Sequence, residues 1–261
     1  MIDAKAVLLD IEGVLHISGV PVPGGEAVVK ALQAAGIPFR CVSNTTRSSR
    51  ATLTSRLKRL GYDIPMSSIF TPPVAAVREI RRRGGGRCYL LATGDVHIDF
   101  ETAGIPLGTE EEVTRFVVIG DAGDDFTYES MNRAFRLLLQ GADLIALEKD
   151  RYWRGAKDLM LSAGPYVAAL EYAAGVSAHL VGKPSAAFFA LALNDMGVAP
   201  RDAVMVGDDI VTDIGGSKSA GMQAVLVRTG KYDEELVTQA RVMPDAIIDS
   251  VASLREVVRF R

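Results

Sequence analysis

Two acidic residues, Asp10 and Glu12, are the first side chains in the sequence that could do chemistry. They follow the apolar run over residues 6–9, which is too short for a helix and is typical of a strand buried on both faces of a parallel sheet. Ligands of open α/β sheets bind beyond the carboxyl ends of the strands. Asp10 and Glu12 therefore either lie at a reactive site or only cap the turn that follows.

Two later strands also end in polar side chains. The predicted strand over residues 37–42 is followed by hydroxyl and amide groups, and the strand over residues 203–206 by carboxylates. In one parallel sheet these groups converge on a single edge with Asp10. We expect Lys183 to join them, with Asp213 about one turn after the last strand end. The residues at these two strand ends are Ser43, Asn44, Thr45, Asp208 and Asp209.

This combination of groups is typical of phosphoryl transfer. Carboxylate oxygens suit Mg²⁺, which takes few protein ligands and keeps waters and substrate phosphate. An Asp carboxylate can form an aspartyl-phosphate, and the reaction otherwise needs positioning and charge neutralisation. Each element also has a simpler explanation, since Ser43 or Asn44 could cap a helix and Lys183 could be a surface lysine. All four elements together, in order, are hard to assign to capping alone.

Helices and strands alternate along the rest of the chain, which predicts an α/β fold with a parallel sheet and right-handed crossovers. A second α/β series begins after residue 84, and the motif-bearing pattern resumes after residue 178. The spacing of apolar residues predicts helices over residues 26–35, 48–60, 71–83, 128–140, 164–174, 182–197 and 251–260. Further strands are predicted over residues 88–91, 116–120, 144–147, 223–227 and 246–248.

Composition excludes several classes of function. The 261 residues are 48% hydrophobic with a formal net charge of -3, which argues against nucleic-acid binding. No apolar run approaches the roughly 20 residues that span a bilayer, and the chain enters a strand without a secretory signal. Cys41 and Cys88 are typical of reduced, buried thiols. We therefore expect a cytoplasmic protein without nucleic-acid or membrane partners.

The strand-end motifs resemble those of the haloacid dehalogenase (HAD) superfamily, in its NagD-type subfamily. The stretches that carry the resemblance are Asp10-Ile11-Glu12-Gly13-Val14-Leu15-His16, Val42-Ser43-Asn44-Thr45-Thr46, Val181-Gly182-Lys183-Pro184 and Val206-Gly207-Asp208-Asp209 with Asp213. The resemblance covers nearly the whole chain. It implies a Rossmann-like three-layer core over residues 1–80 and 181–261, and a second α/β cap domain over residues 81–180. The cap is inserted between the second and third motifs.

The resemblance also implies a Mg²⁺-dependent phosphatase acting on a small phosphorylated substrate. Asp10 is then the nucleophile, and Lys183 neutralises charge on Asp10 and on the phosphate. The implied metal ligands are Asp10, Asp208 and the main-chain carbonyl of Glu12. The implied phosphoryl-binding residues are Ser43, Asn44, Thr45 and Lys183, while Asp209 and Asp213 orient metal waters and Lys183 from outside this set.

Glu12 departs from the family pattern, which has Asp at this position as the general acid and then the general base. The Glu carboxylate lies one methylene further out, and ~1 Å of misplacement can cost about a hundredfold in rate. Three interpretations follow: an active hydrolase with Glu12 as acid and base, a slow one that favours good leaving groups, or a phosphoryl-binding scaffold protein.

Two features outside the motifs have alternative interpretations. His16 could face the substrate or be a hydrogen-bonded structural histidine. The basic and aromatic cluster Arg151, Tyr152, Trp153, Arg154 and Lys157 could face an anionic leaving group, be a solvated loop, or anchor a dimer through Trp153. By resemblance, a homodimer formed through the cap is expected.

Overall fold

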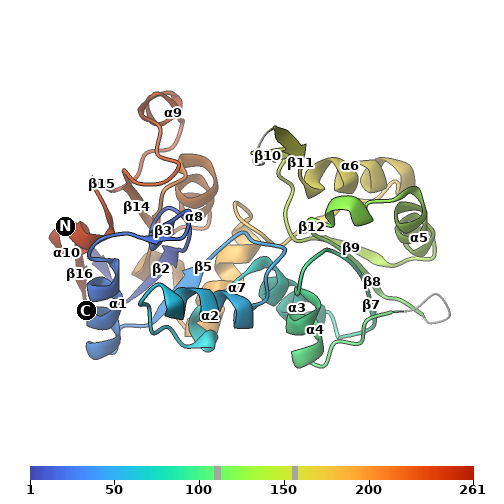
Figure 1. Ribbon diagram of the computed structural model, residues 1–261, viewed down its shortest axis with the longest axis horizontal. Helices are drawn as coiled ribbons and strands as arrows, with labels where there is room; N and C mark the ends of the chain where they lie inside the picture. The colour runs from blue at the N-terminus through green and yellow to red at the C-terminus, as the bar shows by residue number, and fades with distance from the viewer. Residues whose placement is uncertain (109–112, 155–157) are drawn as a thin grey trace. The chain divides into compact units, whose positions relative to one another are not determined.

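The computed structural model describes residues 1–108, 113–154 and 158–261, and the chain divides into two compact units (Figure 1). The first unit contains Met1–Ser43, Arg50–Phe70 and Lys183–Arg261. The second contains Asn44–Ser49 and Thr71–Gly182. The predicted start of the inserted domain, residue 81, falls near the end of α3 (Pro72–Arg82), which belongs to the second unit.

A six-stranded parallel sheet forms the centre of the first unit, with β2 flanked by β13 and β5. Every residue of β2 is buried, as expected for a strand covered on both faces. The parallel sheet predicted from the sequence is thus confirmed. Its strands, in spatial order, are β15 (Ala246–Ile248), β14 (Gln223–Val227), β13 (Ala203–Gly207), β2 (Ala6–Asp10), β5 (Phe39–Val42) and β6 (Ile69–Phe70).

Helices cover both faces of this sheet and give three layers. On one face, α1 (Gly25–Ala34) and α2 (Arg50–Arg59) pack on alternate strand residues, such as Val7 and Leu9. On the other face, α7 (Ala186–Met196) places Phe188 edge-on to Phe70, with ring centroids 5.3 Å apart. The turn η4 (Ile210–Gly215) packs there on β14, and α8 (Gly216–Ser219) and α9 (Glu234–Gln239) follow it.

The second unit has its own parallel sheet and core. Helices α5 (Tyr128–Leu139) and α6 (Ala163–Ala174) pack on it through residues such as Leu138 and Val167. Thr127 and Ser130 form a reciprocal capping box that fixes the start of α5. A short antiparallel hairpin, β10 (Tyr152–Arg154) and β11 (Leu159–Leu161), precedes α6. The sheet strands, in spatial order, are β12 (His179–Leu180), β9 (Asp143–Ala146), β8 (Phe116–Ile119) and β7 (Cys88–Leu91).

The helix predicted over residues 251–260 is wrong in its second half. The turn η5 (Val251–Ser253) and α10 (Leu254–Val257) are helical, but β16 (Val258–Phe260) is a strand that pairs in parallel with β1 (Ile2–Ala4). The pairing joins the two ends of the described chain. A local pattern of apolar residues cannot reveal a strand partner so distant in sequence.

The remaining elements are short. The hairpin of β3 (His16–Ile17) and β4 (Val20–Pro21) follows β2, and α4 (His97–Thr102) follows β7. Single helical turns are η1 (Met66–Ser68), η2 (Gly123–Asp125) and η3 (Pro200–Asp202). Among the residues described, no helix has both the length and the apolar composition needed to cross a bilayer.

Candidate active site

Three buried carboxylates meet at the carboxyl end of the first unit's sheet. Asp10 is the last residue of β2, and Asp208 directly follows the adjacent strand β13. Asp213 comes from η4, the π-helical turn that follows. One oxygen from each of the three lies within 4.8 Å of the other two. The convergence expected for Asp10, Asp208 and Asp213 is therefore present.

Lys183 lies inside this carboxylate cluster and is itself buried. Its ammonium donates to Oδ1 of Asp10 and, over 2.7 Å, to Oδ1 of Asp213. Burial alone would lower the pKa of Lys183, but the two carboxylates raise it above its ordinary value. Lys183 is therefore a fixed positive charge beside Asp10.

Asp213 links this lysine to the backbone that carries Asp208. Its Oδ2 accepts from the main-chain nitrogens of Asp208 and Asp209, each over 3.2 Å. A side chain at Gly207 would put its Cβ 2.3 Å from Cβ of Asp213, so only glycine fits before Asp208. One buried carboxylate thus positions both Lys183 and the loop after β13.

Asp208 is held by a main-chain hydrogen bond that the sequence did not predict. Its Oδ2 accepts from the main-chain nitrogen of Lys231 over 2.7 Å. Added Cβ atoms at Gly13 and Gly230 would lie 1.9 and 2.0 Å from the same oxygen, and both glycines have positive φ. Gly230 and Lys231 follow β14, whose carboxyl end lies at the same sheet edge. The strand-end rule, applied to β14, would have pointed to this segment but not to the main-chain bond of Lys231.

The side chain of Glu12 is bound to the β3–β4 hairpin. Its Oε1 accepts from the main-chain nitrogen of Ser18 over 2.7 Å, and its Oε2 lies 3.0 Å from Nδ1 of His16. Ser18 has a φ of 49°, and the Glu12 carboxylate is 55% exposed. His16 is buried, and burial lowers its pKa. In this conformation Glu12 caps the hairpin, with the buried His16 beside it.

The main-chain carbonyl of Glu12 is available as a ligand. Within the described part of the chain it accepts no hydrogen bond, because the bridge between residues 12 and 16 uses the carbonyls of Ile11 and His16. Oδ2 of Asp10 likewise accepts none there, since Lys183 contacts Oδ1. Two buried carboxylates and a free carbonyl form an all-oxygen donor set, which fits Mg²⁺.

Burial changes the acidity of both proposed carboxylate ligands. It raises the pKa of Asp10 to about 8 against the lowering effect of Lys183, and Asp213 and Asp208 raise it further. Burial also raises the pKa of Asp208 to about 6, against the hydrogen bond from Lys231. Repulsion and desolvation therefore destabilise the ionised cluster, and a bound cation would relieve both.

The other predicted site residues follow β5 and β13. Ser43 follows β5 in the first unit and donates its main-chain N–H to Phe70 over 3.3 Å. Asn44 and Thr45 belong to the second unit, where Asn44 lies close to Gly182, the residue before Lys183. Asp209 caps η4 by accepting from Val211 and Thr212, 2.9 Å each, rather than joining the three carboxylates.

The predicted basic and aromatic cluster lies on and around the β10 strand. Trp153 lines a cavity of about 480 Å³ in the second unit, together with Arg47, Asp121, Phe126 and Tyr166. The guanidinium carbon of Arg47 lies 5.8 Å from the centre of the Trp153 ring, and Phe126 and Tyr166 stack with centroids 3.7 Å apart. Lys157, which the sequence analysis included in this cluster, lies outside the described residues.

Family models match both halves of the core. The model described as haloacid dehalogenase-like hydrolase matches residues 7–106, and the HAD-hydrolase-like model matches residues 180–254. Between them they include Asp10, Lys183, Asp208 and Asp213.

Similar proteins extend this match to nearly the full length. The chain is 43% identical to haloacid dehalogenase-like hydrolase domain-containing protein 2 of Bos taurus over 90% of each chain. It is 41% identical to phospholysine phosphohistidine inorganic pyrophosphate phosphatase of Xenopus laevis, covering 95% of this chain and 92% of that one. The structure of NagD from E. coli K-12 superposes with a TM-score of 0.86 at 28% identity, covering 96% of this chain and 98% of NagD.

Proposed function

The chain belongs to the haloacid dehalogenase-like hydrolases and is a NagD-type phosphohydrolase, and on this premise we propose that Asp10 is its nucleophile. The proposed reaction is hydrolysis of a small phosphorylated substrate, a phosphomonoester or a pyrophosphate-like compound, through an aspartyl-phosphate. The observation that carries it is the buried Lys183 ammonium held between Asp10 and Asp213. This arrangement supports a hydrolase over a phosphoryl-binding scaffold, because it leaves one oxygen of the nucleophile free.

In the first step, Oδ2 of Asp10 attacks phosphorus while the bond from phosphorus to the leaving oxygen breaks. The electron pair of that bond goes to the leaving oxygen, which takes a proton from an acid or departs as an anion. Lys183 stays protonated and offsets negative charge on Asp10 and the phosphoryl group. In the second step, water adds to phosphorus, the Asp10–phosphorus bond breaks, and the water proton passes to a base.

Glu12 is the proposed acid and base, but its hydrogen bond from Ser18 competes with that role. To reach a leaving oxygen, the carboxylate must leave the β3–β4 hairpin. This competition supports the interpretation of a slow hydrolase that favours good leaving groups, because such groups depart without a proton donor. General acid catalysis typically raises the rate about 10²–10⁴-fold. Its loss therefore slows substrates with poor leaving groups most.

Mg²⁺ is the proposed cofactor, held by carboxylates of Asp10 and Asp208 and the main-chain carbonyl of Glu12. The cluster of buried oxygen donors supports a hard cation there. When bound, the ion supplies positive charge that stabilises the phosphoryl oxygens. Asp213 is proposed to stay on Lys183, since both of its oxygens are already engaged.

Substrate binding is proposed to use Ser43, Asn44 and Thr45 for the phosphoryl group, and the Trp153 cavity of the second unit is a separate candidate for contacts with a leaving group. Arg47 lines this cavity and follows Asn44 by three residues, so the chain can separate them by only about 11 Å. Aromatic walls favour a flat or apolar leaving group. Arg47 adds a cation for any negative charge on it.

A homodimer through the cap is proposed from the β10–β11 hairpin. Tyr152, Leu159 and Leu161 are 55%, 58% and 60% exposed, which forms an apolar surface of the kind that proteins use for association. Sedimentation of the wild type and Leu161→Arg tests this proposal. A dimer that becomes a monomer in the variant is expected, and identical sedimentation would contradict it.

A cytoplasmic location is proposed because both cysteines, Cys41 and Cys88, are buried and unpaired. Reduced thiols are typical of proteins in reducing compartments. Cell fractionation with an antibody to the chain checks this assignment.

The proposed reaction is tested by hydrolysis of p-nitrophenyl phosphate with Mg²⁺, comparing wild type with Asp10→Asn. We expect measurable turnover for wild type and roughly a hundredfold loss or more in the variant, because the amide is not a nucleophile. Equal, near-background rates for both proteins, with phosphate still bound, would favour the phosphoryl-binding alternative. If wild type turns over p-nitrophenyl phosphate, a panel of phosphorylated metabolites can then be screened to identify the substrate.

A further inference from the structure

A second cavity, of about 440 Å³, lies in the first unit at the amino end of β5. Ile37 precedes that strand, and Ala35 ends α1 just before it, whereas Asp10 and Ser43 follow the carboxyl ends of their strands. The cavity therefore opens at the opposite edge of the sheet from the candidate active site. Its volume lies in the range of small-molecule sites, about 300–1,000 Å³.

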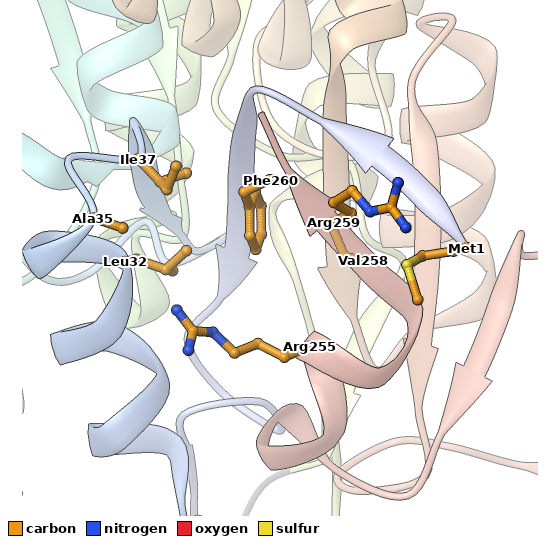
Figure 2. Close-up of a pocket in the computed structure, with 8 residues that line it drawn as sticks. All are labelled: Met1, Leu32, Ala35, Ile37, Arg255, Val258, Arg259 and Phe260. Carbon is orange, nitrogen blue, oxygen red and sulfur yellow. The ribbon is translucent and has the colours of Figure 1, made fainter.

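The walls of this cavity are mostly apolar. Leu32 and Ile37 face it from the α1 side, and Phe260 faces it from β16 (Figure 2). Leu32 and Val258 are buried and belong to the main core, so the floor of the cavity is rigid. An apolar ligand here would contact the core directly and would cover the partly exposed ring of Phe260.

Two arginines with no partner complete the lining. Arg255 extends from α10 toward α1, and Arg259 projects from β16 beside Met1 (Figure 2). Both side chains are exposed, neither makes a hydrogen bond or an ion pair with any described residue, and no Asp or Glu lines the cavity, although Asp3 is the register partner of Arg259. The nearby acids Asp3 and Asp202 are already paired, with Arg261 and Lys5. The cavity is thus apolar and locally positive in a chain whose net charge is -3.

We propose that this cavity binds a medium-chain carboxylate, an unbranched apolar chain with one anionic head. The chain lies against Leu32, Ile37 and Phe260, and the carboxylate pairs with Arg255, with Arg259 adding positive potential. A guanidinium holds a carboxylate through two parallel hydrogen bonds, which selects this head over a neutral hydroxyl. The proposal is independent of the phosphatase reaction, because it involves none of the residues assigned to that site.

The test is a ligand-observed NMR titration of the protein with octanoate, 1-octanol and acetate. Saturating inorganic phosphate and Mg²⁺ keep the phosphoryl site occupied, so octanoate binding there does not contribute. We expect octanoate to bind roughly tenfold more tightly than 1-octanol, and acetate to show no binding. Equal binding of octanoate and 1-octanol would overturn the proposal, as would no octanoate binding at all.

Variants locate the site. Arg255→Gln is expected to weaken octanoate binding roughly tenfold, and Arg259→Gln is expected to weaken it less. Ala35→Trp fills the cavity from an exposed position and is expected to abolish binding. Arg241→Gln removes an exposed arginine elsewhere and serves as the matched control, with unchanged affinity expected. Octanoate affinity that is unaffected in both Arg255→Gln and Ala35→Trp would exclude this cavity as the site.

Discussion

Nζ of Lys183 lies 2.7 Å from Oδ1 of Asp213, which fixes the lysine next to Asp10, the proposed nucleophile. In Asp213→Asn the amide cannot accept from Lys183 and from two backbone N–H groups together, and Lys183 loses one of its two negative partners. Breaking a buried pair costs about 3–5 kcal/mol, so we expect the free energy of unfolding to fall by about 3 kcal/mol. Turnover of p-nitrophenyl phosphate should fall roughly tenfold or more.

The matched control for this prediction is Asp249→Asn, which breaks the pair of Asp249 with Arg228. Asp249 is 86% exposed, so about 0–1 kcal/mol is expected. Urea unfolding of the three proteins measures the difference. Equal destabilisation by both substitutions would mean that the buried pair of Asp213 with Lys183 contributes no more to stability than an exposed pair does.

Gly13 is predicted to be irreplaceable because of the space that Asp208 occupies. Gly13→Ala puts a Cβ 1.9 Å from Oδ2 of Asp208, so the metal ligand or the loop must move. Gly19→Ala is the control, since Gly19 has a similar φ of 80° and nothing within 4 Å of its Cβ. We expect Gly13→Ala to lose Mg²⁺ binding by calorimetry and Gly19→Ala to keep it. Retained Mg²⁺ affinity in Gly13→Ala would refute the geometry given for Asp208.

Glu12 is predicted to limit the rate with poor leaving groups. Glu12→Asp is one methylene shorter, cannot hold Ser18 in the same way, and has the residue type of the efficient family phosphatases. We expect it to raise turnover of an alkyl phosphate roughly tenfold, with a smaller gain on p-nitrophenyl phosphate. Glu12→Gln can still accept from Ser18 but cannot take the proton of the attacking water, so nitrophenyl turnover should fall. If Glu12→Gln instead leaves that turnover unchanged, Glu12 is not the acid and base of the wild type.

The contribution of Asp10 and Asp208 to the stability of the metal-free protein is predicted to fall as pH rises. Burial raises the pKa of Asp208 from its ordinary value of 3.8 to about 6 in the folded state. It raises the pKa of Asp10 to about 8. Between the ordinary and the raised pKa values the native state binds more protons than the unfolded chain, so the free energy of unfolding decreases with pH. Mg²⁺ requires ionised ligands and should stabilise the protein more above about pH 8 than below about pH 6.

Thermal unfolding with Mg²⁺ and with a chelator, at both pH values, measures this effect. The increase in Tm produced by Mg²⁺ is the quantity to compare, since other pH effects act on both samples. An increase that is the same at both pH values would show that Asp10 and Asp208 do not bind the ion as ionised ligands.

Strand ends in the first unit were predictable because they depend on local patterns. The buried run before Asp10 and the run before Gly207 are short, apolar and bounded by polar residues, and parallel topology then brings Asp10 and Asp208 together. The orientation of Glu12 was not predictable, because it depends on a hydrogen bond to Ser18 in a hairpin that leaves no clear pattern. The strand at Val258–Phe260 depends on a partner at the other end of the chain.

The contribution of Lys231 was missed for a different reason. Its main-chain nitrogen, rather than its side chain, holds Asp208, and any non-proline residue could donate that bond. Gly230 is more informative, since it comes three residues after the buried strand β14, and a glycine near a strand often marks close backbone approach.

The most direct test of the account is chemical trapping of phosphorylated Asp10. Wild type is mixed with Mg²⁺ and p-nitrophenyl phosphate, quenched in acid, reduced with borohydride and digested for mass spectrometry. A good leaving group speeds the first step, while the hydrogen bond from Ser18 holds Glu12 away from the water of the second step, so the intermediate should accumulate. We predict conversion of Asp10 to homoserine in wild type and none in the unmixed control; nitrophenol release with Asp10 unmodified throughout would contradict the account.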